Sequence, residues 1–185
     1  MRQTVKRLED PLYVSGEIRT QSASDFLRTT ISVDIICNAI TALVAPQQYD
    51  AGLDAIQLIK QGTHLHRTHP NIDHWISVWS GLAIIVNRKT PWHRDQGGAP
   101  THYDLLLSAG THTDCVLDIP ILGLTLSYLP GTVVAIVGKV IGHGVRVWDG
   151  GERICQARFI KDAVHDRLGL VRPEWVNHNT YIGLA

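Results

Sequence analysis

Apolar residues recur at helical spacing in the first third of the chain. Between residues 25 and 43 they fall mostly three or four positions apart, which predicts an amphipathic helix. Ser22 or Ser24 could cap the start of this helix, and Asp25 would lie in its first turn. We expect Pro46 to end it.

A second, shorter amphipathic helix is expected over residues 51–60, where Gly62 stops the pattern. Because each segment has one apolar face, we interpret them as helices that pack on one face of a sheet.

The pattern changes after residue 70, where short runs rich in β-branched and aromatic residues are separated by glycine and proline. Eight such runs predict strands, at residues 75–79, 82–86, 103–107, 115–119, 124–128, 132–137, 145–148 and 154–159. Regularly spaced short strands indicate a sandwich or a barrel, and eight of them suit a double-sheet jelly roll. The expected fold class is therefore mainly β with N-terminal helices (α+β), around a jelly-roll core.

The whole chain, residues 1–185, is predicted to form a single domain, because its length allows one substantial core and no repeat or linker interrupts it. A helical support region takes about residues 1–70 and the β core about residues 71–165. Residues 166–185 form a C-terminal tail, expected as loop or a last helix.

Composition narrows the class of protein further. An apolar fraction of 44% with 18% charged residues is typical of a globular chain, and a net charge of zero gives no general attraction to nucleic acid. No apolar run has transmembrane length, and no signal-peptide pattern is present at Met1, so no membrane partner is expected. The widely spaced Cys37, Cys115 and Cys155 argue against a disulfide framework and fit a reducing, intracellular compartment.

Candidate chemistry centres on a His-x-Asp pair. His93 and Asp95 are two residues apart, so on an extended segment both side chains point to the same side. His143 lies between Gly142 and Gly144, which would allow a close backbone approach and give a second imidazole access to the pair. Two imidazoles and one carboxylate are the ligands that hold non-haem Fe(II) in oxygenases, with one face of the metal left open.

An oxo-acid cosubstrate at such a metal needs a cation for its far carboxylate. Arg153 starts the strand after the turn at residues 149–152, and its guanidinium could pair bidentately with 2-oxoglutarate. A three-residue turn would put Arg153 on the face of His143, whereas a four-residue turn would favour Arg158. The sequence leaves both open.

Three runs resemble the iron- and 2-oxoglutarate-dependent dioxygenases with a double-stranded β-helix core: His93-Arg94-Asp95, Gly142-His143-Gly144-Val145 and Gly151-Glu152-Arg153. Further runs resemble, in their order, the TET/JBP oxygenase domain, particularly its short fungal versions: Asn87-Arg88, residues 103–110, residues 130–134 and Gly138. The resemblance covers roughly residues 75–165.

The resemblance implies Fe(II), 2-oxoglutarate and O2, with oxidation of a methylated nucleobase, 5-methylcytosine or N6-methyladenine, in DNA. By the same resemblance His93, Asp95 and His143 are the metal ligands and catalytic residues, and Arg153 and Arg88 bind 2-oxoglutarate. A surface basic residue at a strand end is an equal interpretation of Arg88. A DNA substrate implies a nuclear location, and a base in a duplex would have to be flipped out to reach the iron.

Other substrates and classes stay open at this point. A duplex binder usually shows a basic patch; Arg88, Lys89 and Arg94, with Arg67, could form one or could be a solvated edge. RNA, a protein or a small molecule could replace DNA as the substrate. A cupin-like or lectin-like binding module, or a catalytically silent relative, could use the same roll, but neither needs an arginine beside an open metal face.

Two further patterns each allow more than one interpretation. His64, His66, His69 and His74 could form an accessory metal site or simply a histidine-rich polar loop. His93-Arg94-Asp95 also matches the kinase catalytic-loop tripeptide, but the chain lacks the glycine-rich loop and the Asp-Phe-Gly of kinases.

Overall fold

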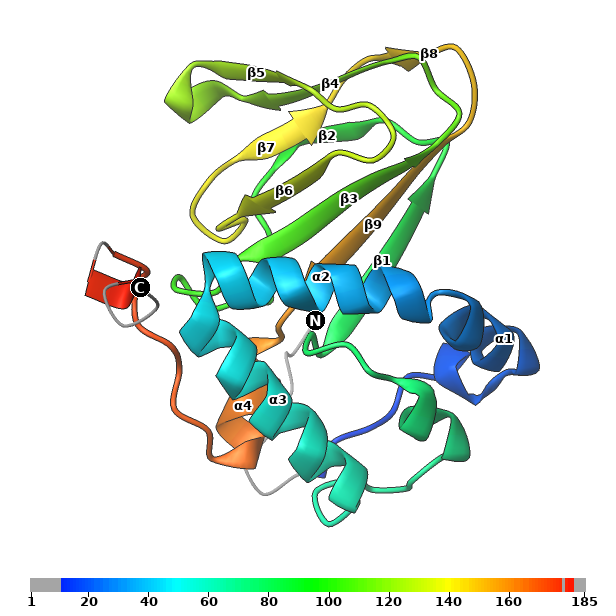
Figure 1. Cartoon of the computed structure of the whole chain (residues 1–185), viewed down its shortest axis with the longest axis vertical. Coiled ribbons are helices and arrows are strands. Elements are labelled where there is room, and N and C mark those ends of the chain that lie inside the picture. Colours follow the sequence, from blue (N-terminus) through cyan, green and yellow to red (C-terminus); the bar gives the residue numbers. More distant parts are fainter. Residues whose placement is uncertain (1–10, 178, 182–185) are drawn as a thin grey trace, which may run out of the picture. The chain divides into compact units, whose positions relative to one another are not determined.

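The computed structural model describes residues 11–177 and 179–181 of the chain. The described residues up to Val78, together with Asp162–Pro173, form one compact unit, which is helical. Trp79–Lys161 and the described residues from Glu174 onward form a second unit, which contains all the strands (Figure 1). That the two units act as one domain, with the helices on a sheet, stays a prediction.

The helical unit contains four α-helices and two 3₁₀ turns: η1 (Glu17–Arg19), α1 (Gln21–Thr29), α2 (Ile31–Val44), α3 (Pro46–Gln61), η2 (Pro70–His74) and α4 (Asp162–Leu168). Two helices, α1 and α2, replace the single helix predicted between residues 25 and 43. The helix also begins earlier than predicted, because Thr20 caps α1 by accepting a hydrogen bond from the backbone N–H of Ala23, at 3.1 Å. The predicted caps Ser22 and Ser24 lie inside the helix.

Pro46 follows the end of α2, as expected, and it is also the first residue of α3. A proline in the first turn of a helix costs no hydrogen bond, because its missing N–H would have no partner within the helix. Gly62 ends α3, as the sequence predicted. Among the described residues no single helix is long and apolar enough to cross a membrane; only α1 and α2 together, bent by 60°, reach that length and composition.

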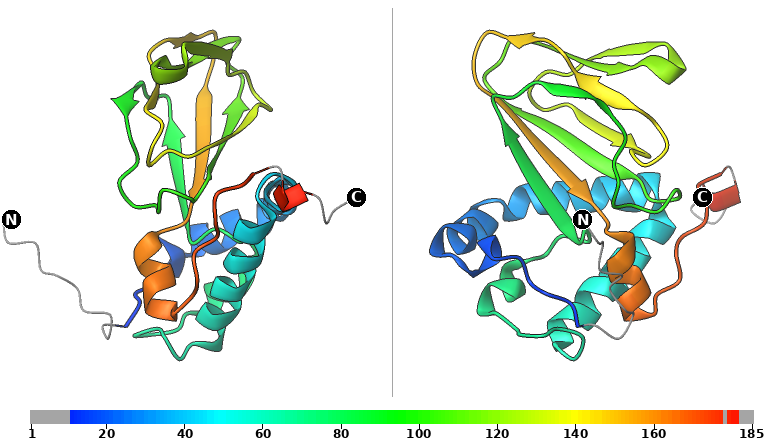
Figure 2. Two further views of the ribbon diagram at one scale, coloured as in Figure 1. Left: turned by 90° about the vertical axis from the view of Figure 1, so that its left-hand side faces the viewer. Right: turned by 180° about the vertical axis from the view of Figure 1, so that it is seen from behind.

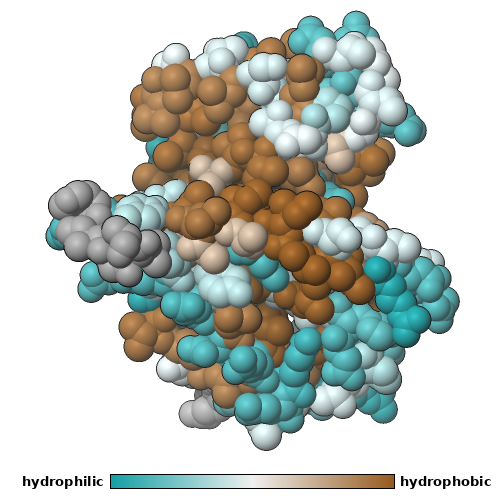
Figure 3. Space-filling view, in the orientation of Figure 1, coloured by the Kyte–Doolittle hydropathy of each residue, from teal (hydrophilic) through white to brown (hydrophobic). Residues whose placement is uncertain are grey.

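The strand predicted at residues 75–79 is absent. The side chain of Asn38, on α2, donates to the carbonyl of Ile76 at 2.9 Å and accepts from the N–H of Val78 at 3.1 Å, so a side chain satisfies this backbone in place of a neighbouring strand. The same helix buries Asp34 and Thr41, while Figure 3 shows apolar side chains gathered over its outward side.

The second unit consists of two antiparallel sheets. The first has the order β1 (Gly81–Val86), β9 (Arg153–Phe159), β3 (Asp104–Gly110), β6 (Val133–Ile136). The second has the order β2 (Thr90–His93), β7 (His143–Val145), β4 (Asp114–Ile119), β5 (Leu124–Ser127), with β8 (Trp148–Asp149) also paired to β4; a short η3 turn (Pro120–Leu122) lies between β4 and β5. The views of Figure 2 show the two sheets as separate layers, which confirms the predicted jelly-roll core.

Two further strands differ from the prediction. The run at residues 145–148 is divided between β7 and β8, and β2 was not among the eight predicted strands, although His93 was expected on an extended segment. β2 contains Pro91 and lacks alternation, but it is an edge strand whose pairing with β7 shifts register, and both features accommodate proline.

The core of this unit lies between the sheets and draws on both. Its buried members are Leu106, Cys115, Leu117, Ile119, Tyr128, Ile136, Val145 and Cys155. Because side chains alternate along a strand, Arg153 shares the core-facing side of β9 with Cys155. Arg158 lies on the opposite face, in register with Leu105.

Candidate metal centre

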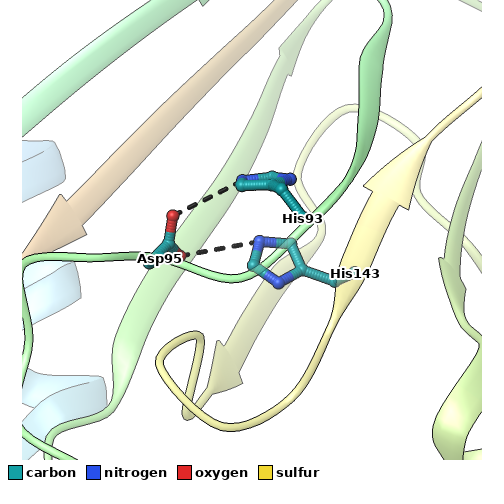
Figure 4. Close-up of side chains that lie close together, drawn as sticks. All are labelled: His93, Asp95 and His143. Atoms are coloured by element: carbon teal, nitrogen blue, oxygen red, sulfur yellow. Dashed lines mark ion pairs between the residues drawn. The ribbon is translucent and has the colours of Figure 1, made fainter.

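Three of the residues selected from the sequence meet at the end of the second sheet. His93 ends β2 and His143 begins β7, and the two are register partners with ring centroids 4.6 Å apart. Asp95 follows β2 and points back at both rings (Figure 4). Its Oδ1 lies 3.4 Å from Nε2 of His93, and its Oδ2 lies 3.7 Å from Nε2 of His143.

The glycines beside His143 allow this approach. A Cβ at Gly144 would press on the backbone of Thr90 and Trp92 in β2, and a Cβ at Gly142 would collide with the indole of Trp92. β7 can therefore lie close enough to β2 for the two imidazoles to face one point.

The backbone orients both rings for a metal. Nδ1 of His93 lies 2.9 Å from the carbonyl of Pro91, and Nδ1 of His143 lies 3.1 Å from the carbonyl of Ile141. A carbonyl can only accept, so each neutral ring carries its proton on Nδ1 and directs the lone pair of Nε2 at the Asp95 side.

This donor set fits Fe(II). One ligand atom from each of His93, Asp95 and His143 lies within 4.8 Å of the others, and the set is two imidazoles and one carboxylate. The side chain of His143 is buried, whereas those of His93 and Asp95 are 39% and 38% exposed, so one side of the centre is open to a substrate.

A second carboxyl group, not selected from the sequence, lies against Asp95. Asp104 is only 5% exposed at the start of β3, and it hydrogen bonds to the Asp95 side chain and to the backbone of Gly138. Burial, and then the negative charge of Asp95, raise the pKa of Asp104 to about 7. A carboxylic acid protonated near neutral pH can donate its proton to the Asp95 carboxylate and hold it in place.

Gly138 connects the two carboxyl groups. Its carbonyl accepts the N–H of Asp95 at 2.9 Å, and a Cβ built on it would collide with Oδ2 of both Asp95 and Asp104. We expect Gly138→Ala to weaken Fe(II) binding by about tenfold or more, because moving the groups around a metal ligand typically has an effect of that size. Anaerobic titration with Fe(II) or Co(II) measures it.

Gly97→Ala is the matched control, since a Cβ at this exposed position near Asp95 meets nothing within 4 Å. Equal metal affinity in the two variants would show that Gly138 does not shape the centre.

Arg153 is a buried cation without a carboxylate. Its side chain is 1% exposed, its Nη1 donates to the carbonyl of Arg88 at 3.0 Å, and its guanidinium lies 5.8 Å from the ring centre of Tyr128. Nε has no hydrogen-bond partner, and no acidic side chain of the described residues forms an ion pair with the group. Burying an unpaired charge is costly, so an anionic ligand fits this position, as the chemistry of 2-oxoglutarate requires.

The structure places the other two candidate arginines differently. Arg158 is equally buried, but on the face of β9 that points away from the core, where its Nη2 donates to Gln156. Arg88 is exposed, and the contact that it makes with Arg153 comes from its carbonyl. The geometry favours Arg153 over Arg158 as the anchor for 2-oxoglutarate; the roles of Arg153 and Arg88 stay predictions.

The second histidine cluster makes structural contacts instead of a site. His69 caps η2, the ring of His66 lies 4.9 Å from that of Tyr13, and His74 accepts from Arg28. Within residues 11–177 and 179–181, His93, Asp95 and His143 are the one group of three or more side chains arranged to share a metal.

Comparison with known proteins shows the family of the chain and supports its fold. The family model Tet_JBP, the oxygenase domain of the 2OGFeDO superfamily, matches residues 14–162. Among solved structures the chain is similar to NgTET1 in complex with 5mC DNA, with a TM-score of 0.61 and 15% sequence identity. The match covers 91% of this chain and 61% of that one, so the chain spans less than two thirds of its structural neighbour. No curated protein sequence matches it.

Proposed function

Since the chain belongs to the Tet_JBP family of 2OGFeDO-superfamily oxygenase domains, it is an Fe(II)- and 2-oxoglutarate-dependent dioxygenase, and we propose that it oxidises a methylated nucleobase in DNA. The methyl group of 5-methylcytosine or N6-methyladenine is the proposed target. The observation that carries the oxygenase chemistry is the convergence of His93, Asp95 and His143 on one point with an open side.

The chain's own residues have separate tasks in this reaction. His93, Asp95 and His143 would hold the metal, and the guanidinium of Arg153 would bind the far carboxylate of 2-oxoglutarate. With O2, the bound metal and cosubstrate supply the oxidant: one oxygen atom enters the methyl C–H bond to give a hydroxymethyl group, and the other enters succinate as CO2 is released.

A DNA substrate is supported by two observations. The structural neighbour NgTET1 was solved with 5mC DNA. In this chain the exposed Arg88, Lys89 and Arg94 flank β2 and could contact phosphates next to the metal centre. A target base would have to leave the duplex to reach the open side of the metal centre. A nuclear site of action is part of the same proposal.

We expect methyl-dependent turnover on DNA. Duplexes that carry 5-methylcytosine or N6-methyladenine are incubated with Fe(II), 2-oxoglutarate and O2, and the nucleosides are analysed by mass spectrometry for the added oxygen. Succinate formation should follow hydroxymethyl product on one of these duplexes and should be absent on the unmethylated duplex and with Asp95→Ala.

Matched methylated RNA, free nucleosides and methylated peptides serve as the competing substrates. Turnover on one of them with none on DNA would overturn the DNA proposal and leave the oxygenase assignment intact.

A further inference from the structure

Asn87, directly after β1, hydrogen bonds to both backbone groups of Arg153. The N–H of Asn87 donates to the carbonyl of Arg153 at 2.8 Å, and the N–H of Arg153 donates to the side-chain oxygen Oδ1 of Asn87, also at 2.8 Å. The last regular pair of the β1–β9 ladder is Val86 with Ile154, so these two bonds add one more pair beyond the end of the strand.

The added pair is unusual because a side chain replaces a backbone carbonyl. In an antiparallel ladder two such residues would exchange two backbone bonds. Asn87 instead has a φ of 49°, in the left-handed region, where the chain leaves the sheet. Asparagine tolerates this conformation better than most residues, and its amide oxygen can accept the bond that would otherwise be lost.

The turn formed by Asn87 and Arg88 also contacts the guanidinium of Arg153. The next residue, Arg88, presents its carbonyl to Nη1 of Arg153 at 3.0 Å. The ring centre of Tyr128 lies 5.8 Å from Cζ of the same guanidinium. Nε of Arg153 has no hydrogen-bond partner. The Asn87-Arg88 turn thus fixes the backbone and one edge of Arg153, and it leaves donor capacity for a ligand.

We propose that Asn87 is a positioning residue for the 2-oxoglutarate anchor: its side-chain oxygen keeps the Asn87-Arg88 turn closed on Arg153, so that the guanidinium is set before the cosubstrate arrives. This inference rests on the proposed role of Arg153. Side chains that are held in place lose less freedom on binding, so the expected benefit is in affinity for 2-oxoglutarate.

The test is anaerobic titration of the Fe(II) protein with 2-oxoglutarate, followed by the visible metal-to-ligand charge-transfer band, with no turnover involved. Asn87→Ala and Asn87→Gly should both weaken binding by about tenfold, the expected effect of losing one partly buried hydrogen bond and the order that it maintains. Glycine keeps the left-handed turn without the oxygen, whereas Asn87→Asp keeps the oxygen and should restore most of the affinity. Wild-type affinity in Asn87→Gly would overturn the proposal.

Two controls separate this proposal from the function on which it rests. Fe(II) affinity should not change in any Asn87 variant, because the hydrogen bonds of Asn87 go to Arg153 and not to a metal ligand. A parallel loss would indicate general disruption and contradict a role through Arg153. In an Arg153→Met background, Asn87→Ala should have no further effect. If Arg153→Met itself leaves 2-oxoglutarate binding unchanged, then the anchor assignment fails, whatever Asn87 does.

Discussion

Asp95→Ala will abolish turnover and leave the two sheets folded. Asp95 supplies the one carboxylate of the metal centre, and both imidazoles face it. Perturbing groups around a metal ligand already lowers affinity by about 10–100-fold, so removal of the ligand itself should exceed about a hundredfold. Fe(II) titration and succinate formation with 2-oxoglutarate and O2 measure the two losses.

The fold should survive because little of its stability depends on this side chain. Asp95 is 38% exposed, and in the metal-free protein its charge disfavours ionised Asp104 while its carboxylate accepts a hydrogen bond from protonated Asp104. These two effects oppose each other, so we expect the metal-free thermal midpoint of the variant to stay close to that of the wild type. Asp114→Ala, an exposed aspartate on β4, is the matched control and should keep full activity.

His143→Ala is the independent check on the same centre. Loss of the charge-transfer band in both His143→Ala and Asp95→Ala would tie the metal to these residues. Full activity in Asp95→Ala would contradict the assignment of the ligands.

The convergence of His93, Asp95 and His143 could be predicted because each residue carries a local signal. His93 and Asp95 share a face wherever the segment is extended, and the glycines around His143 indicate a close approach that the structure shows. The strand β2 was missing from the eight predicted strands because an edge strand with a bulge needs no alternating pattern.

Other parts of the site depend on contacts distant in sequence. Asp104 opens a mostly apolar strand, which was the available signal, but nothing in its own segment shows that Gly138 joins it to Asp95. The break between α1 and α2 at Thr30 likewise has no proline or glycine to mark it. The length of the turn at residues 149–152 decides whether Arg153 or Arg158 faces the core. The sequence of this turn is compatible with three or four residues, so it did not decide between the two arginines.

Arg153→Met should raise the Michaelis constant for 2-oxoglutarate far more than that for the methylated substrate. Hydrogen bonds between charged groups contribute about 1.5–3 kcal/mol each, so loss of a bidentate pair should weaken cosubstrate binding by about a hundredfold or more. Methionine fills much of the space beside Tyr128 without a charge, which limits the cavity that alanine would leave. Steady-state kinetics with each substrate varied in turn gives both constants.

Arg158→Met is a close control, because Arg158 lies on the same strand and is as buried as Arg153 but faces away from the core. A general effect of losing a buried arginine would appear in both variants, as a lower thermal midpoint and lower turnover. An effect on 2-oxoglutarate confined to Arg153→Met would therefore identify the inward face of β9 as the cosubstrate side of the centre. If Arg158→Met alone raised that constant, the anchor would lie on the other face, and the unpaired Nε of Arg153 would need a different ligand.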